Sequence, residues 1–440
     1  MSSPFPTVAG EGGPIGTPQP RLRIAVIGGG VAGLTAAWLL APRHDVVLYE
    51  KNPRPGGHTY TVVLPDGPDA GTPVDTGFIV FNPRNYPTFV RLLERLGVAS
   101  QASDMSFSYH RARDGFHYAG TGLNGLFSRR RSLGSPAFLR MLGDLVRFNG
   151  RARADLRAGR LGGVSIGDYV RGLRLSDGFR DWYLAPMASA IWSTCTAEVL
   201  AFPATAFLQF FENHGLLQLS GAPRWRTVTG GSHAYVKALL AQFGHDGGEV
   251  RLGAPVRAVR RDEHGAIVTA GRAERYDRVV IAAHADEALA MLEDPSADER
   301  RLLGAWRYTV NRAVLHSDAS VLPPRRRAWA AWNYEEEPAK SGLAPVCVTY
   351  WMNRLQRLKT KQTWCVTLNR QTPIDERAVV ERITWMHPYY DARALATQAE
   401  LPSLNGVRHT YYCGSYFRYG FHEDAVASAA AVGQALGATL

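Results

Sequence analysis

IAVIGGGVAGLTAAWLLAPRHDVVLYEKNPRPGGHT, residues 24–59, is the stretch that decides the fold. Its apolar start is typical of a buried strand, and Gly28, Gly30 and Gly33 then complete the spacing GxGxxG. The first glycine permits a tight turn, the second lets a pyrophosphate approach the backbone, and the third lets the following helix pack on the strand. The spacing therefore predicts a strand–turn–helix unit whose helix N-terminus binds the phosphates of a dinucleotide.

An acidic residue after the next predicted strand, residues 45–49, limits which dinucleotide fits. Glu50 follows that strand, 17 residues after Gly33. A carboxylate there accepts hydrogen bonds from ribose hydroxyls and repels a 2′-phosphate, which disfavours NADP. A second glycine pair, Gly56 and Gly57, follows so closely that it indicates backbone brought against a second part of an extended cofactor.

Length and composition describe a globular protein of two domains. A chain of 440 residues exceeds the size at which single cores stop growing, and 45% of its residues are hydrophobic against 20% charged. The four cysteines are scattered without a CxxC pair, which is typical of reduced thiols in a cytoplasmic protein and predicts no metal site. Residues 1–20, rich in glycine and proline, predict a disordered leader rather than a signal peptide.

Arginine concentrates in one segment of this basic chain. The formal net charge is +11, and between Arg129 and Arg160 the only acids are Asp144 and Asp155. In the same segment one face of a predicted helix carries Phe138, Leu142, Leu145 and Phe148, beside Arg140, Arg147 and Arg151. Such a helix either lies on anionic lipid, at the inner face of a membrane, or is an ordinary surface helix. Because no recognition module accompanies the charge, we expect no nucleic-acid partner.

The run from Glu50 to Gly77 resembles the flavin-containing amine oxidase and phytoene desaturase group. This resemblance implies FAD, with Glu50 on the adenosine ribose. It implies further contacts near the pyrophosphate from Arg54, Gly56, Gly57 and His58. It also implies that the backbone of residues 77–81, which include Gly77 and Phe78, lies beside the isoalloxazine ring. Residues 227–243 and 249–259 resemble the group's middle element, in which the strand backbone at Val256 meets the adenine.

The last stretch, TYYCGSYFRYGFHEDAVASAAAVGQAL (residues 410–436), resembles the group's closing motif. Gly414 ends the predicted strand, and the terminal helix opens at Phe421, His422, Glu423 and Asp424. A helix N-terminus aimed at the flavin would stabilise the negative charge that appears on reduction. No cysteine or histidine sits in a recognisable attachment motif, so we expect the FAD to be non-covalent.

Several positions depart from the amine oxidases of this group. His58 stands where they usually carry arginine, and Phe421 stands where they place a tyrosine of the aromatic cage that polarises an amine. Their flavin-proximal lysine has no counterpart, since no lysine lies between Lys237 and Lys340. These departures disfavour amine oxidation.

A closer resemblance is to a bacterial branch of predicted NAD/FAD-binding oxidoreductases. The stretches GGHTYTV, VDTGFIVFNPRNYPTFVRLLERLGV, YAGTGLNGLFSRRR, VTYWMNRLQ and GFHEDA fit that branch nearly end to end. It is similar to the flavoprotein domain fused before plant cyclopropane-fatty-acid synthases, and its members are associated with such methyltransferases. The resemblance implies a redox step on an alkyl chain, such as a modified fatty acyl group.

The residues between the motifs are compatible with an oily substrate. Residues 183–193, 201–211, 348–352 and 383–390 are rich in aromatic residues and methionine, with few ionisable residues between them. Such stretches form either the wall of an apolar tunnel or a plain core. A charged substrate would need a buried counter-charge, and none stands out.

We expect the flavin to supply the chemistry, with a hydride moving from a substrate carbon to flavin N5 and a nearby base taking the proton. His422 is the best candidate for a group at the flavin edge. Tyr350, Asn353 and His387 are candidates in the substrate pocket. Each has a structural alternative, because His422 could cap its helix and the other three could serve in packing or hydrogen bonding.

The order of the motifs predicts an α/β fold with a Rossmann-like FAD-binding domain, residues 21–104, 222–289 and 403–440. A discontinuous α+β substrate domain is predicted from residues 105–221 and 290–402, as in the two-domain amine oxidases. The leading functional hypothesis is an FAD-dependent desaturase, dehydrogenase or oxidase of lipid metabolism that acts on a hydrophobic, fatty-acyl or lipid substrate. The alternatives are a non-oxidising FAD- or lipid-binding module of a lipid methyltransferase and, third, an amine oxidase.

Overall fold

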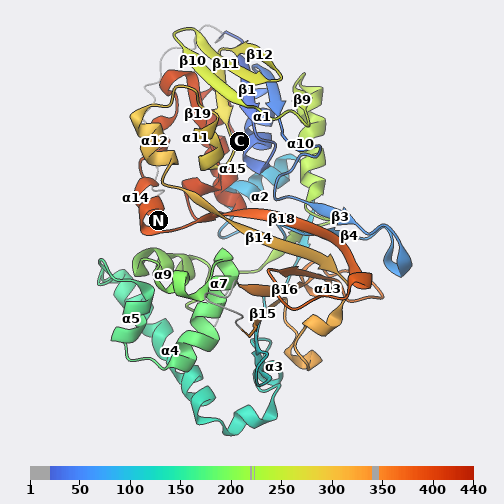
Figure 1. Cartoon of the computed structure of the whole chain (residues 1–440), viewed down its shortest axis with the longest axis vertical. Helices are drawn as coiled ribbons and strands as arrows, with labels where there is room; N and C mark the ends of the chain where they lie inside the picture. Colours follow the sequence, from blue (N-terminus) through green and yellow to red (C-terminus); the bar gives the residue numbers. More distant parts are fainter. Residues whose placement is uncertain (1–19, 219–220, 222, 339–345) are drawn as a thin grey trace.

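The structure is a computed structural model that describes residues 20–218, 221, 223–338 and 346–440. The predicted leader, residues 1–20, lies outside the described residues except for Pro20. Figure 1 shows an upper part and a lower part. The upper part holds a parallel sheet with strands from early and late segments of the chain, and the lower part holds a larger sheet and most of the green and teal helices.

A parallel sheet of five strands organises the upper part. Its strand order is β19-β13-β1-β2-β9, and every neighbouring pair runs parallel. The strands are β1 (Arg23–Ile27), β2 (Asp45–Tyr49), β9 (Glu249–Arg251), β13 (Arg278–Ile281) and β19 (Thr410–Tyr412). The five strands come from three segments of the chain, residues 23–49, 249–281 and 410–412, which are more than a hundred residues apart.

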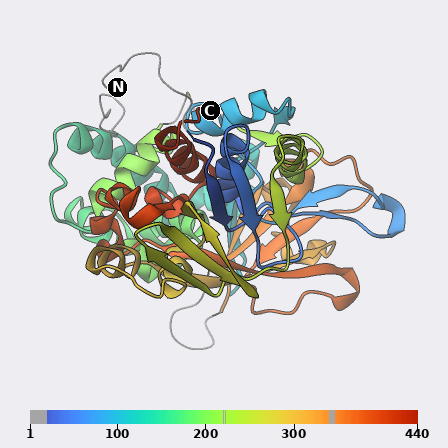
Figure 2. The same cartoon turned by 90° about the horizontal axis from the view of Figure 1, so that it is seen from above.

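Helices cover one face of this sheet and a small second sheet covers the other. Ile24 and Val26 of β1 pack with α1 (Val31–Leu40), α10 (His233–His245) and α15 (His422–Ala435). Ala25 and Ile27 point to the opposite face, toward the antiparallel strands β10 (Ala258–Asp262), β11 (Gly265–Ala270) and β12 (Arg272–Tyr276). This alternation is the ordinary two-residue period of a strand buried on both faces. Figure 2 shows the small sheet in olive and α15 in dark red beside the blue strands.

A mostly antiparallel sheet of seven strands organises the lower part. Its order is β18-β14-β17-β16-β15-β6-β7, with only β15 and β6 parallel among these described strands. The strands are β6 (Phe107–Arg111), β7 (Phe116–Ala119), β14 (Arg307–His316), β15 (Trp332–Glu336), β16 (Cys347–Trp351), β17 (Cys365–Leu368) and β18 (Val379–Tyr389). The long pair β14 and β18 runs along the junction of the two parts (Figure 1).

Helices from the middle of the chain pack beside this sheet. They include α4 (Pro136–Arg157), α5 (Ile166–Gly172), α7 (Ala185–Trp192) and α9 (Ala204–Asn213). Phe138 and Phe148 of α4 are fully buried, and Leu142 and Leu145 pack against the same core. The apolar face that the sequence offers to a lipid surface therefore faces the protein interior. The predicted domain limits stay a prediction.

Within the described residues, no helix combines the length and the hydrophobicity that a membrane crossing requires.

Candidate functional site

A cavity of about 1510 Å³ is lined by residues of both parts. On its upper side it meets the carboxyl ends of four parallel strands, at Gly28 after β1, Glu50 after β2, Ala282 after β13 and Gly414 after β19. Ligands of open α/β sheets bind at this edge of the sheet. Pockets for one small molecule are about 300–1,000 Å³. The cavity therefore has room for an extended cofactor and a second molecule beside it.

The first glycine motif is shaped by backbone contacts that no side chain would allow. A Cβ atom on Gly33 would lie 1.8 Å from the carbonyl oxygen of Gly28, so α1 packs directly on the turn. Gly28 itself has a φ of +108°, and a Cβ there would lie 2.6 Å from the carbonyl oxygen of Ala282. A Cβ on Gly30 would meet no atom within 4 Å, because it would point into open space of the cavity.

The second glycine pair rests on the first. The Gly56 amide donates to the Gly29 carbonyl at 2.7 Å, and a Cβ on Gly57 would lie 3.1 Å from the Gly30 Cα. Arg54 lies at the same edge, where its guanidinium donates to the Gly57 carbonyl at 3.2 Å. The two motifs therefore form one backbone cradle at the N-terminus of α1, with a cationic side chain beside it.

Glu50 is held in place by three hydrogen bonds. Its carboxylate accepts from the Gly29 amide at 2.7 Å, from the Asn52 amide at 2.8 Å and from the Asn52 side chain at 2.7 Å. A carboxylate has about four acceptor positions, so one remains unused by these bonds, and Glu50 lines the cavity. Sequence reasoning missed Asn52, although an amide two residues after the acid is a local signal that could have identified it.

After β4 (Pro73–Asp75), residues 76–80 line the cavity, whereas Phe81, the last residue that was predicted beside the flavin ring, does not. A Cβ on Gly77 would lie 2.1 Å from the His58 carbonyl oxygen, and the Phe78 amide donates to that same oxygen at 2.9 Å. Gly77, Phe78 and His58 all line the cavity, and so does Val256. The structure thus gathers these predicted contacts around one cavity.

The N-terminus of α15 also faces the cavity. Gly414, Phe421 and His422 line it, whereas Glu423 and Asp424 do not. Glu423 accepts from the Thr88 and Phe89 amides and so caps α2 (Pro87–Arg95). Asp424 accepts from the Phe421 amide at 2.9 Å, and burial raises its pKa to about 7. These two acids therefore position the helix from behind.

His422 is enclosed by polar and aromatic neighbours. Its Nε2 lies 3.0 Å from both the Thr59 hydroxyl and the Tyr235 hydroxyl, and its ring stacks on Phe78 with the centroids 3.6 Å apart. Burial lowers its pKa to about 3. His422 is therefore a neutral imidazole tied to two hydroxyls, and its role at the flavin edge stays a prediction.

Three further histidines gather on the cavity wall. The ring centroid of His58 lies 5.4 Å from that of His387 and 6.2 Å from that of His284, and His58 stacks on Trp385 at 4.8 Å. Burial lowers the pKa of all three, that of His387 to about 4. Among the described residues no group of histidine, cysteine or acidic side chains has the arrangement of a metal site. His284 and Trp385 have no motif that could have indicated them, because the ring of His58 that both approach lies in a distant segment of the chain.

The other two pocket candidates, Tyr350 and Asn353, differ in whether they line the cavity. Tyr350 lines the cavity, where its ring packs edge-on against Trp332 at 4.9 Å. Asn353 lies outside the cavity wall: its side chain donates to the Thr360 hydroxyl and accepts from the Trp364 amide. Asn353 therefore orders its own loop.

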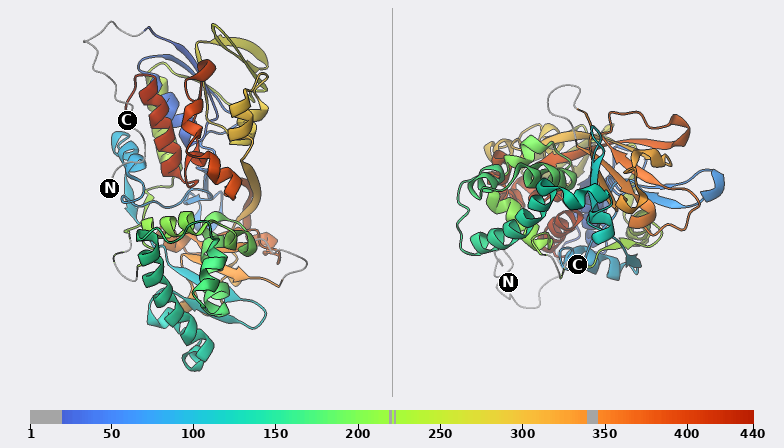
Figure 3. Two further views of the ribbon diagram at one scale, coloured as in Figure 1. Left: turned by 90° about the vertical axis from the view of Figure 1, so that its left-hand side faces the viewer. Right: turned by 90° about the horizontal axis from the view of Figure 1, so that it is seen from below.

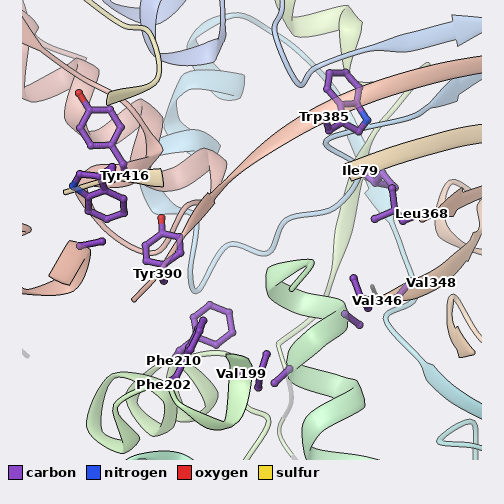
Figure 4. Close-up of a cluster of buried hydrophobic side chains, with 14 of the residues drawn as sticks. Ile79, Val199, Phe202, Phe210, Val346, Val348, Leu368, Trp385, Tyr390 and Tyr416 are labelled. Atoms are coloured by element: carbon purple, nitrogen blue, oxygen red, sulfur yellow. The ribbon is translucent and has the colours of Figure 1, made fainter. Parts of the chain in front are cut away.

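The lower side of the cavity is apolar and aromatic. Phe421 stacks on Phe210 of α9 at 5.3 Å, and Phe210 also contacts Trp192 at 4.7 Å. Figure 4 shows Phe210 below Tyr390 and Tyr416, which come from the C-terminal segment. The hydroxyls of both tyrosines are buried without a partner in the described residues although both residues line the cavity. Sequence reasoning missed these two hydroxyls.

The sequence from residue 31 to residue 436 matches the family model of flavin-containing amine oxidoreductases. The chain belongs to this family. The predicted resemblance is thus confirmed, FAD is the cofactor, and the chain stands among the FAD-dependent oxidoreductases.

Two curated relatives share parts of the sequence. A carotenoid phi-ring synthase from Streptomyces griseus is 29% identical over 282 residues, which are 59% of this chain and 52% of that relative. A hydroxyneurosporene desaturase from Rubrivivax gelatinosus is 46% identical over 63 residues, which are 14% of this chain and 11% of that relative. The chain thus spans about half the length of the first relative and less of the second.

Solved structures share the whole architecture. Cyclohexylamine oxidase from Brevibacterium oxydans IH-35A has a TM-score of 0.69 at 16% identity, covering 95% of this chain and 100% of that one. A fatty acid isomerase from P. acnes that produces CLA has a TM-score of 0.65 at 17% identity, covering 94% and 98%. At these identities the likeness concerns the fold alone, and it confirms the predicted two-domain α/β class.

The residues of the cavity fit FAD. Gly30 leaves open space where a pyrophosphate approaches, and the N-terminus of α15 offers its positive end. The buried His58 Nε2, like the two tyrosine hydroxyls, has no partner in the described residues. Buried polar atoms beside a cavity are normally satisfied by a ligand or by water.

Proposed function

We propose that this chain is an FAD-dependent oxidoreductase that removes hydrogen from the alkyl chain of a fatty-acyl or lipid substrate. The observation that carries the proposal is the wall opposite the glycine cradle. That wall is formed by Met187, Ile191, Trp192, Phe210 and Tyr350. Apolar side chains of this kind bind a hydrocarbon chain by removing its surface from water.

None of the five side chains that form this wall carries a charge. Asp104 and Arg354 form a salt bridge at 2.8 Å, so neither offers a free counter-charge to a substrate. The histidines of the wall are neutral because burial lowers their pKa. A cationic or anionic substrate head would therefore lose its hydration without a partner in this region.

Bound FAD would supply the two-electron acceptor that takes the hydride of a broken substrate C–H bond. The second hydrogen leaves the substrate as a proton, and a C=C bond forms. A neutral imidazole can accept that proton, and we infer that His387 does so. His387 lines the cavity, and the structure records no hydrogen bond of its ring among the described residues. His422, whose Nε2 contacts two hydroxyls, then serves to position the start of α15.

Anaerobic spectroscopy tests the proposal. We expect the purified protein to be yellow and its flavin to bleach when the lipid that accumulates in cells lacking this chain is added. His387→Asn lowers the bleaching rate about 100-fold while the flavin content stays that of the wild type, in line with the usual worth of a general base. The matched variant His245→Asn, at an exposed histidine, leaves the rate unchanged. A colourless protein that cannot be reconstituted with FAD contradicts the proposal.

Two other functions make different predictions. A non-oxidising module of a lipid methyltransferase co-purifies with that enzyme, and its flavin does not bleach with any lipid; the basic surface described below favours this second candidate. An amine oxidase forms peroxide with simple amines. Against it stands Phe421, where the resemblance implies a tyrosine of the aromatic cage; the Phe421 ring stacks on Phe210.

A further inference from the structure

One end of the lower part carries exposed apolar side chains. Leu123, Leu133, Leu139 and Val146 are 76%, 52%, 46% and 55% exposed, and all lie within 24 residues of sequence. They belong to α3 (Leu123–Leu126), to the turn η2 (Arg130–Gly134) and to the first half of α4. Figures 1 and 3 show this region at the end of the molecule farthest from the five-stranded sheet. Single exposed leucines are ordinary, but four in neighbouring elements form a patch.

The same region is strongly cationic. Residues 123–147 contain five arginines and one acid, Asp144. Asp144 is buried and accepts from the Ser176 amide, so it does not offset the charge at the surface. Among the described residues, Arg131, Arg140 and Arg147 form no ion pair, and all three are exposed.

A second arginine cluster extends this charge. Residues 325–327 are three exposed arginines, and the turn η5 (Arg326–Ala328) packs against α3. Arg129, Arg325 and Arg327 all lower the pKa of His117, after the larger effect of burial, so their charges gather around one buried side chain. We call these arginines, with those of residues 129–147 and the four apolar side chains, the α3–α4 surface.

The outward stripe of α4 combines both features. Leu139 and Val146 are seven residues apart, as are Arg140 and Arg147, so each pair repeats on one side of the helix. The opposite stripe, with Phe138 and Phe148, is fully buried. This outward stripe is therefore a separate apolar and basic face, distinct from the face that the sequence pattern had indicated.

The α3–α4 surface continues into the cavity. Gly120 and Thr121 line the cavity, and Leu123 is 76% exposed only two residues later. A molecule that lies on this surface is thus next to a segment of the cavity wall.

We propose that the α3–α4 surface docks on an anionic lipid membrane, with the four apolar side chains in the acyl boundary and the arginines on lipid phosphates. The entry of a lipid chain past Gly120 and Thr121 rests on the proposed function; the docking itself does not. Charge alone would also suit a nucleic acid, but exposed leucines gain nothing from phosphates, whereas basic and apolar residues together are the pattern of interfacial helices.

Vesicle flotation of the FAD-bound full chain tests the proposal. We expect binding to vesicles of phosphatidylcholine with phosphatidylglycerol and much weaker binding to phosphatidylcholine alone. Each arginine near an anionic surface contributes about fivefold in partition, so Arg131→Gln, Arg140→Gln and Arg147→Gln together lower binding about 100-fold. Leu139→Ser with Val146→Ser lowers it at least about tenfold, since two apolar side chains leave the lipid.

Matched controls keep the test specific. Val63→Ser with Val407→Ser removes two valines that are 59% and 52% exposed elsewhere, and Arg43→Gln with Arg260→Gln removes two exposed arginines. Both controls float like the wild type. Flavin absorbance and thermal melting show that every variant is folded.

Three outcomes would overturn the docking proposal. They are a holoprotein that does not float, control variants that lose as much as the surface variants, and binding to duplex oligonucleotide that survives Leu139→Ser with Val146→Ser while vesicle binding is absent. Failure of the proposed function gives a different result, namely a holoprotein that floats but whose flavin never bleaches with lipid.

Discussion

On the upper side of the cavity the wall is mostly backbone, whereas on the lower side it is mostly side chains. Gly28, Gly30, Gly33 and Gly57 meet neighbouring main-chain atoms directly or leave a gap for the cofactor. Across the cavity the rings of Trp192, Phe210 and Tyr390 form the wall, and Figure 4 shows the last two. A backbone cradle tolerates few substitutions of its glycines, because an added Cβ atom either fits or collides with neighbouring main-chain atoms. An apolar wall accepts many substitutions of similar volume, so it can change with the substrate.

The largest effect is expected from breaking the upper side at its tightest contact. In Gly33→Ala the new Cβ stands 1.8 Å from the Gly28 carbonyl, and we expect the free energy of unfolding to fall by more than about 3 kcal/mol. Thermal melting of the apoprotein measures this loss. Gly30→Ala is the matched control, since its Cβ meets no atom: it should melt like the wild type and lose only FAD. Equal melting of both variants would contradict the cradle geometry.

Glu50→Gln sharpens the comparison without a steric change. The amide keeps the shape of the side chain but loses the charge and one acceptor oxygen, and hydrogen bonds to charged groups are worth about 1.5–3 kcal/mol. We expect the dissociation constant of FAD, measured by titration of the apoprotein, to rise about tenfold to 100-fold. Glu249→Gln, an exposed acid on the neighbouring strand β9, serves as control. Unchanged FAD affinity would remove Glu50 from the cofactor contacts.

A charge on the lower side should separate substrate from cofactor. Ile191→Glu puts a carboxylate on the apolar wall, and we expect the lipid concentration for half-maximal bleaching to rise at least about tenfold at unchanged flavin content. Val310→Glu, at a residue that is 57% exposed, should change neither quantity. The comparison between the two sides fails if Ile191→Glu releases FAD and leaves lipid binding intact.

The smallest effect concerns the acid behind the closing helix. Burial raises the pKa of Asp424 to about 7, above the value of an unfolded chain, so its contribution to stability is fully present below about pH 4 and is lost as the pH rises through 7. Asn in Asp424→Asn does not titrate, so the variant does not lose this stability as the pH rises. Its amide oxygen can still accept the hydrogen bond from the Phe421 amide. Relative to the wild type, the variant should gain on the order of 1 kcal/mol between pH 5 and pH 8 in urea unfolding. A pH-independent difference would show that Asp424 does not titrate in this range.

Local sequence motifs predicted most of the residues on the cofactor side of the cavity, because each motif is short and its glycines act through contacts with neighbouring backbone. The predicted contacts at Gly30, Glu50, Gly77 and Phe421 all line one cavity. Asp424 and Glu423 belong to the same motif but face away from it, since a helix turns successive side chains by about 100°. Sequence order alone does not say which residue of a helix start points inward.

The amphipathic helix shows the opposite case. Its apolar face was visible in the sequence, but a buried face and a lipid-facing face have the same periodicity. Only the packing of Phe138 and Phe148 against the lower core separates the two, and it leaves Leu139 and Val146 outside.

By itself the sequence determined the nucleotide-binding unit, the acid Glu50 at the cavity and the closing helix, because these depend on contacts within a few residues of each motif. Tertiary structure alone decided which histidines and aromatic rings share the cavity. His58, His284 and His387 come from three distant segments, and their rings come together on the cavity wall only in the folded chain. Such contacts depend on how whole sheets pack, and the spacing of residues along the chain does not indicate that packing.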